Sequence, residues 1–168
     1  QLTKKVLIRA LKIYSVGIFL WLWPDFNFDE IRWVGVLPRI AFVFLGCALL
    51  FLYTSRKTQL YIGIIILLFY WIIMAYIPVP GIGIPDLSVP EKNWAHYIDK
   101  LLLPGRLWQQ TWDPEGILST LPSIASGIMG MISGYILLKK DELGERINQL
   151  FFFGFILLFS GELMQWVF

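Results

Sequence analysis

Apolar residues gather in long runs that are separated by short polar links and by one long, more polar segment. The apolar runs cover roughly residues 6–23, 33–53, 60–77, 116–138 and 150–168, and the long segment covers residues 78–115. A helix needs about 20 predominantly apolar residues to cross the ~30 Å hydrocarbon core of a bilayer, and these runs approach or reach that length. The pattern predicts an all-α protein, a polytopic transmembrane helical bundle with about five spans.

The composition agrees with a membrane environment. Hydrophobic residues make up 57% of the chain and charged residues only 15%, whereas a soluble domain carries about 25% charged residues. Aromatic residues are 17% of the chain, which is typical of proteins with aromatic belts at the membrane interfaces. We expect the lipid bilayer to be the first partner. A net charge of +2 without a basic run argues against nucleic-acid binding, and the single cysteine, Cys47, excludes an intrachain disulfide.

The ends of the chain indicate a partial multi-pass domain. It starts without Met and stops inside the apolar run "LMQWVF". We therefore expect residues 1–168 to be a piece of a larger protein.

The distribution of positive charge predicts the orientation in the membrane. Basic residues cluster before and within the first run, in the second link "TSRKTQ" and in the fourth link "KKDELGERINQ". The first link, "PDFNFDEIR", is acidic apart from Arg32, and the long segment dilutes its cations. Because cytoplasmic loops carry the excess of Lys and Arg, we expect a cytoplasmic N-terminus and an external segment 78–115.

The fourth apolar run contains small residues at helical spacing. Ser123, Ser126, Gly130 and Gly134 recur at three- and four-residue steps and share one face. The pair Gly130-x-x-x-Gly134 is typical of close helix–helix packing in membranes. Pro122 lies near the start of the run and removes a backbone donor there. The same small side chains could instead make room for a ligand, and the sequence leaves both interpretations open.

Arg9 and Lys12 lie near an end of the first apolar run and can reach the interface. Two further charged residues lie within apolar runs, where charge is costly and usually marks a partner or a pathway. Arg39 lies about two turns into the second run, towards the external side, and needs an anion or a carbonyl. Glu162 lies deep in the last run. An ion pair between them is one alternative, and a substrate contact by Arg39 is the other.

The long segment predicts a short surface helix over residues 90–103. Ser88 and Glu91 have the spacing of a capping box before it. The helix would turn Asp99 and the single histidine, His96, to its polar face. Since no second His or Cys accompanies His96 to make a metal site, we expect no metal and treat His96 as a solvated residue.

The corner "TWDPEG" begins the fourth run with two carboxylates. Asp113 and Glu115 suit the positive end of a helix dipole, so a helix cap explains them without chemistry. The alternative is that they bind a sugar hydroxyl or ammonium group. Trp108 and Trp112 would then stack on sugar rings, although an interfacial aromatic belt explains them equally.

Several motifs together resemble a known family. They are "GVLPRIA", "IPVPGIGIPDL", "NWAHYIDKLLLPGRLW" and "TWDPEGILSTLPSIASGIMG", in this order. The chain resembles the middle of the heparan-α-glucosaminide N-acetyltransferase family, in its bacterial branch DUF5009, some members of which are described as N-acetylglucosamine transporters (NagX). Pro38 stands where the family commonly has Gln.

The resemblance implies a membrane-bound acyltransferase of a bacterial inner membrane that moves an acetyl group from cytoplasmic acetyl-CoA, as cosubstrate, to the amine of an external glucosamine-type sugar. It also implies that the catalytic histidine belongs to a segment absent from this chain, so that no catalytic residue is assigned here. Asp113, Glu115, Arg39, Trp112 and Trp108 are the candidate substrate-binding residues. The alternatives are an amino-sugar transporter and a structural membrane subunit, and a homo-oligomer is left open.

Overall fold

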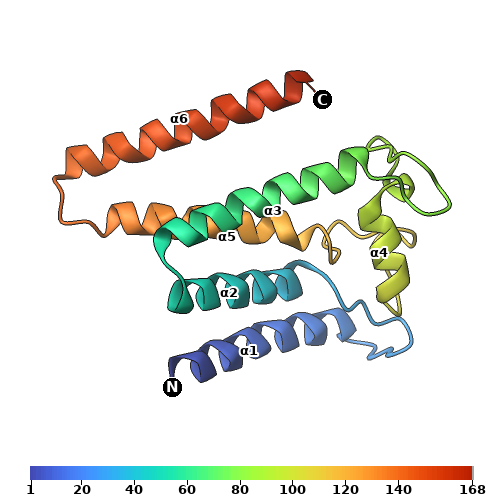
Figure 1. Cartoon of the computed structure of the whole chain (residues 1–168). Helices are drawn as coiled ribbons and strands as arrows, with labels where there is room; N and C mark the ends of the chain where they lie inside the picture. The colour runs from blue at the N-terminus through green and yellow to red at the C-terminus, as the bar shows by residue number, and fades with distance from the viewer. Residues whose placement is uncertain (168) are drawn as a thin grey trace. The chain divides into compact units, whose positions relative to one another are not determined.

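The computed structural model describes residues 1–167 and is helical without strands in that range (Figure 1). The helices are α1 (Leu2–Leu22), α2 (Val36–Tyr53), α3 (Arg56–Tyr76), the 3₁₀ turn η1 (Pro90–Lys92), α4 (Trp94–Leu102), α5 (Thr120–Leu137) and α6 (Leu143–Val167). The chain divides into two compact units, residues 1–128 and 129–168, and the boundary falls within α5. The predicted all-α class is confirmed.

Four helices are long and apolar enough to cross a membrane among the described residues. They are α2, α3, α5 and the residues 143–166 of α6. The remaining long helix, α1, has 21 residues but carries its cations in its first three turns. The structure is therefore consistent with the predicted helical membrane bundle of about five helices. The largest difference from the predicted starts is at α6, which begins seven residues earlier, whereas α1 and α3 begin four residues earlier and α5 begins four residues later.

Local residue chemistry explains where the helices of the first unit begin and end. α1 ends just before Pro24, whose ring cannot continue a helix. α2 follows Gly35, whose φ of 151° favours glycine, and places Pro38 in its first turn, where no intrahelical N–H bond is lost. α3 begins after Ser55, whose side chain accepts a hydrogen bond from the N–H of Thr58.

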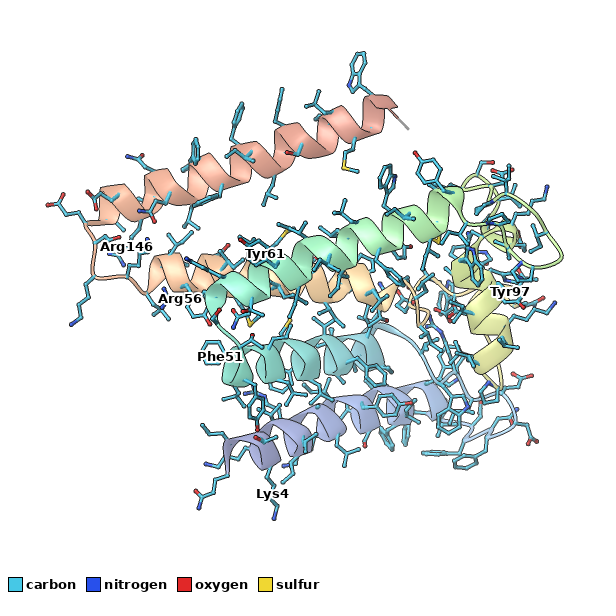
Figure 2. All side chains as sticks on the ribbon, in the orientation of Figure 1. Lys4, Phe51, Arg56, Tyr61, Tyr97 and Arg146 are labelled. Carbon is cyan, nitrogen blue, oxygen red and sulfur yellow. The ribbon has the colours of Figure 1, made fainter. Side chains whose placement is uncertain are left out.

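The two links expected on the external side lie at the same end of the first unit. The link after α1 joins the long segment through Arg106, whose Nη1 donates to Glu30 Oε2 and whose backbone N–H donates to Ile31 O. Thr3 and Tyr53 are hydrogen-bonded to each other at the opposite end. In Figure 2 the long segment's Tyr97 accordingly lies far from the N-terminal part of α1. This topology matches the alternation that the charge pattern requires.

Close helix contacts in the first unit occur at glycines. A Cβ at Gly17 of α1 would lie 2.6 Å from Pro38 Cδ, and a Cβ at Gly127 of α5 would lie 2.5 Å from Cys47 Sγ. A Cβ at Gly130 or Gly134 would meet no atom within 4 Å among the described residues. The close approach to α5 within the first unit is therefore at Gly127. Gly130 and Gly134 belong to the second unit, and their predicted packing role stays a prediction.

Small polar residues in α5 bond within their own helix. Ser123 Oγ donates to Ser119 O, and Ser126 Oγ donates to Pro122 O. These bonds satisfy the hydroxyl groups at membrane depth without a partner helix. The predicted packing role of Ser123 and Ser126 stays a prediction.

The predicted surface helix in the long segment exists, but its start was wrong. Asn93, not Ser88, is the N-cap of α4, and its side chain accepts from the N–H of His96. Ser88 instead bonds with Asp86 Oδ1. The residues Pro90–Lys92 form η1, with Pro90 at its first position, where no intrahelical N–H bond is lost, and the extended backbone of Asn93 separates η1 from α4.

The second unit contains the end of α5, a short basic link and α6. Arg146 Nη1 donates to Leu137 O, and Lys139 Nζ donates to Gln149 Oε1, so both cations satisfy acceptors near the ends of their helices. Glu162 is exposed within α6. Its predicted role as an intramembrane partner stays a prediction.

Candidate functional site

Arg32 joins the two carboxylates of the Asp-Pro-Glu-Gly corner. Its Nε donates to Asp113 Oδ2 and its Nη2 to Asp113 Oδ1, both at 2.6 Å, which makes a bidentate pair. The same Nη2 also donates to Glu115 Oε2 at 2.5 Å. One guanidinium group therefore fixes both carboxylates at the end of the unit where the two links meet.

Aromatic rings cover this ion pair. The guanidinium carbon of Arg32 lies 5.0 Å from the ring centroid of Trp108 and 5.6 Å from that of Trp21. Cation–π contacts of this kind contribute on the order of 0.5–2 kcal/mol each. Trp108 itself is 52% exposed, so it forms the outer wall of the cluster. We call Arg32, Asp113, Glu115, Trp21 and Trp108 the Arg32 cluster.

Both members of the pair stay charged. Burial acts to lower the pKa of Arg32, but hydrogen bonds and charge from Asp113 and Glu115 outweigh it and raise that pKa. Burial likewise acts to raise the pKa of Asp113, and hydrogen bonds from Arg32, Glu115 N–H and Trp108 N–H outweigh it, so that the pKa lies below its ordinary value. The cluster is a salt bridge at neutral pH.

Asp113 has no oxygen left for a ligand. Oδ2 accepts from Arg32 and from the N–H of Trp108, and Oδ1 accepts from Arg32 and from the N–H of Glu115. Its side chain has no exposed surface. The geometry thus gives Asp113 the role of anchoring Arg32 and the corner, in place of the substrate contact expected from the sequence. Nor does it cap α5, which begins only at Thr120.

Glu115 is the more accessible carboxylate. Its side chain is 20% exposed, and it lines a cavity of about 410 Å³ between α2 and the start of α5. Arg32 contacts both carboxylates, and Arg39 supplies a second cation in the wall of the same cavity, so the charges at the rim nearly balance. As the partly exposed carboxylate, Glu115 can accept hydrogen bonds from a hydroxyl-bearing or ammonium-bearing ligand.

Arg39 lies in the wall of the same cavity. Its Nη2 donates to Pro114 O and to Ser119 Oγ, so it binds the corner through neutral acceptors. The sequence predicted that Arg39 needs an anion or a carbonyl as partner, and Pro114 O fills that role. The Nε of Arg39 is buried and remains without a hydrogen-bond partner.

Asp99 is a buried carboxylate that the sequence placed wrongly on the solvent-facing side of its helix. It is 1% exposed, and its Oδ1 accepts from the N–H of Ile117. It fits there because Gly116 has no side chain: a Cβ at Gly116 would overlap both carboxylate oxygens. Asp99 Oδ2 has no hydrogen-bond partner. Asp99 thereby fastens α4 to the segment that carries Glu115.

The environment of Asp99 shifts its ionisation. Burial raises the pKa of Asp99 from 3.8 to about 6, against the hydrogen bond from Ile117; the negative charge of Asp113 adds to the rise, and Arg39 opposes it. Perturbed carboxyl groups of this kind gather at functional sites.

The other sequence candidates lie around this site without joining it. His96 is half-buried on α4 with its Nδ1 unsatisfied, and Trp112 contributes its carbonyl oxygen to the N–H of Gln109. No three His, Cys, Asp or Glu side chains within residues 1–167 converge in a way that could hold a metal ion.

The sequence pattern did not identify Arg32 as a site residue, and it did not predict that Asp99 is buried. A signal for Arg32 existed, because it is the only cation of an acidic link on the same predicted membrane side as Asp113 and Glu115. The burial of Asp99 depends on Gly116, which lies far from it in the sequence and meets it only in the folded chain. The sequence pattern therefore contained no signal for it.

No family model matches the chain, and no curated protein matches its sequence. The fold defines a class, a multi-pass helical membrane protein with a charged site at one end of its first unit. The resemblance to the acetyltransferase family stays a prediction.

Proposed function

We propose that this chain forms the sugar-binding part of a membrane-bound acyltransferase, which moves an acetyl group from acetyl-CoA to the amine of a glucosamine-type sugar. The observation that carries the proposal is Glu115, an accessible carboxylate that Arg32 holds in a fixed orientation at the rim of a cavity. The motif resemblance gives the reaction its class.

The chemistry assigns separate tasks to the residues. In acetyl transfer the amine nitrogen attacks the thioester carbonyl, the C–S bond breaks, the thiol of CoA leaves and the amine loses a proton. Glu115 would hold the acceptor sugar through its ammonium or hydroxyl groups, and Trp108 would offer a flat apolar face beside it. The group that accepts the proton belongs, by the resemblance, to a histidine-containing segment outside this chain.

The proposed setting is a bacterial inner membrane with the α4 end of the first unit facing outward. The positive charges near the start of α1 and α3 support this orientation. Acetyl-CoA would then react from the cytoplasmic side and the sugar from the external side.

The reaction is tested with the full-length protein in liposomes. Acetyl-CoA labelled in its acetyl group is supplied on one face and glucosamine on the other, and label on the sugar amine is measured. The Glu115→Gln variant should lose most of the transfer at low sugar concentration. Absence of labelled sugar from the intact protein in either orientation would refute the acyltransferase.

Transport of an amino sugar is the second candidate, because the cavity that contains Arg39 extends from the polar rim along α2. In the same liposomes, this function predicts that sugar crosses the membrane unmodified and that no label is transferred. The two functions therefore give opposite results in one assay.

A further inference from the structure

The cavity beside Glu115 has a polar end and a long apolar body. Its wall on α2 consists of residues at helical spacing that form one stripe along the helix. From the rim inward these residues are Pro38, Arg39, Phe42, Leu45, Gly46 and Leu49. On the opposite side Ile117, Thr120 and Ile124 continue the wall into α5. Charge is confined to Arg39 and Glu115, both at the rim.

The length of the cavity exceeds what a sugar head group needs. Arg39 and Leu49 are ten residues apart, and at about 1.5 Å per residue the stripe extends about 15 Å along α2. That is about half of the ~30 Å hydrocarbon core. The cavity thus begins at the charged rim and continues into the depth of a helix that is apolar enough to span the membrane.

We propose that this cavity binds an amphiphile, with its polar head at Arg39 and Glu115 and a hydrocarbon chain along α2. The inference rests on the proposed function for the identity of the head, and it makes the acceptor a glycolipid, an amino sugar carried on a hydrocarbon chain. The free sugar alone would leave the apolar body of the cavity without a ligand group.

The two charged residues at the rim differ in what they offer a ligand. Arg39 is held within the unit, because its Nη2 donates to Pro114 O and Ser119 Oγ and its Nε is buried. Glu115 is partly exposed in the same wall, so it would accept hydrogen bonds from hydroxyl or ammonium groups of the head group.

A second cavity in the same unit provides an internal comparison. It also measures about 410 Å³ and shares Phe42 and Leu45 as a wall, but Leu7, Ala10, Leu11, Tyr14 and Ala41 complete it, without any charged group. Such a site has nothing to orient a head group. The charged rim distinguishes the first cavity as a site for an amphiphile.

The test uses photolabelling of the full-length protein, which does not depend on turnover. The probe is an alkyl glucosaminide with a diazirine near the end of its alkyl chain, and the labelled peptides are mapped by mass spectrometry. We expect label on the inner part of α2, near Leu45 and Leu49, and near Ile124. An unlabelled alkyl glucosaminide should displace it at concentrations at which glucosamine or an alkyl alcohol does not.

Matched variants sharpen the result. Leu49→Trp fills the inner part of the cavity and should lower the affinity for the probe at least about tenfold, because losing the burial of two methylene groups is worth that much. Leu11→Trp makes the same change in the uncharged cavity and should leave the affinity within about twofold. Glu115→Gln should weaken probe binding without moving the site of labelling.

Each remaining outcome overturns one statement. Equal labelling of both cavities, or equal displacement by the alkyl alcohol, would show a lipid-filled groove and refute the glycolipid site. Acetylation of free glucosamine together with no labelling near Leu49 would refute the glycolipid acceptor and leave the acyltransferase standing. Specific labelling with no acetylation of the probe or of glucosamine would retain the amphiphile site and refute the acyltransferase.

Discussion

Arg32 and Asp113 form a bidentate ion pair across 81 positions of sequence, with both hydrogen bonds at 2.6 Å and with the aspartate side chain fully buried. The pair ties the link after α1 to the link before α5. Two charges placed in such surroundings are costly to desolvate, so their joint geometry, rather than either charge alone, stabilises this end of the unit.

Removal of Arg32 should strongly destabilise the fold. Arg32→Ala leaves Asp113 charged and buried without its partner, and a loss of about 3–5 kcal/mol in the free energy of unfolding is expected. Arg32→Lys keeps the charge but not the two parallel bonds, so its loss should be smaller. Thermal unfolding in detergent measures both variants. As control, Arg106→Ala removes an exposed pair with Glu30 and should cost less than about 1 kcal/mol.

Substitutions of the two carboxylates of the corner should have different effects, on stability at Asp113 and on ligand binding at Glu115. Asp113→Asn removes the charge that Arg32 needs and should lower the unfolding temperature markedly. Glu115→Gln alters the accessible carboxylate and should leave the unfolding temperature nearly unchanged while weakening binding of an amino sugar about tenfold or more, since a charge-assisted hydrogen bond contributes about 1.5–3 kcal/mol. Isothermal titration measures the binding. Equal loss of stability in both variants would contradict the distinction.

The contact between Gly116 and Asp99 should be specific. Gly116→Ala places a methyl group where the carboxylate oxygens of Asp99 lie, and a cost of about 1–3 kcal/mol is expected from overpacking. Asp99→Ala in the same chain removes the overlap, so the double variant should be more stable than the sum of the two single losses. A double-mutant cycle measured by denaturant unfolding gives this coupling. Simple additivity would show that the two residues do not touch.

The pH dependence of stability should contain a contribution from Asp99. Its pKa is about 6 in the folded protein and 3.8 ordinarily, so the folded state holds a proton that the unfolded state releases between those values. Its contribution to stability is therefore fully present below about pH 4 and is lost as the pH rises through about 6. Asp113, whose pKa is lowered, contributes with the opposite sign.

Asp99→Asn isolates this contribution. Thermal unfolding of the wild type and the variant is compared from about pH 4 to about pH 8, and the stability of the wild type relative to the variant should fall across that range. Because Asp113 is present in both proteins, its effect cancels. A constant difference would mean that Asp99 titrates near its ordinary pKa.

Two glycines of α5 should respond differently to the same change. Gly127→Ala pushes a methyl group against Cys47 Sγ and Val43 and should destabilise the protein by about 1–3 kcal/mol. Gly130→Ala meets open space and should be neutral or slightly stabilising, since alanine is the better helix former. Unfolding in detergent measures both. A comparable loss at Gly130 would support the predicted small-residue interface around Gly130 and Gly134.

The sequence by itself determined the elements and their environment. Length and hydropathy predict the apolar helices, because a membrane admits only helices whose backbone is satisfied internally. The charge pattern predicts that the link that contains Arg32 and the corner that contains Asp113 lie on the same side of the membrane, and the fold brings the two segments together. The helix in the long segment was also predicted, although Asn93 rather than Ser88 begins it.

Only the tertiary structure decided what each charged residue does. Asp113 and Glu115 are two positions apart and look equivalent in sequence, yet one is saturated by four donors and the other lines a cavity, because a side chain's access depends on what folds over it. Asp99 has the helical position of a surface residue, but the absence of a side chain at Gly116 lets it be buried there. Burial and partner geometry arise from contacts between distant segments, and a local pattern does not contain them.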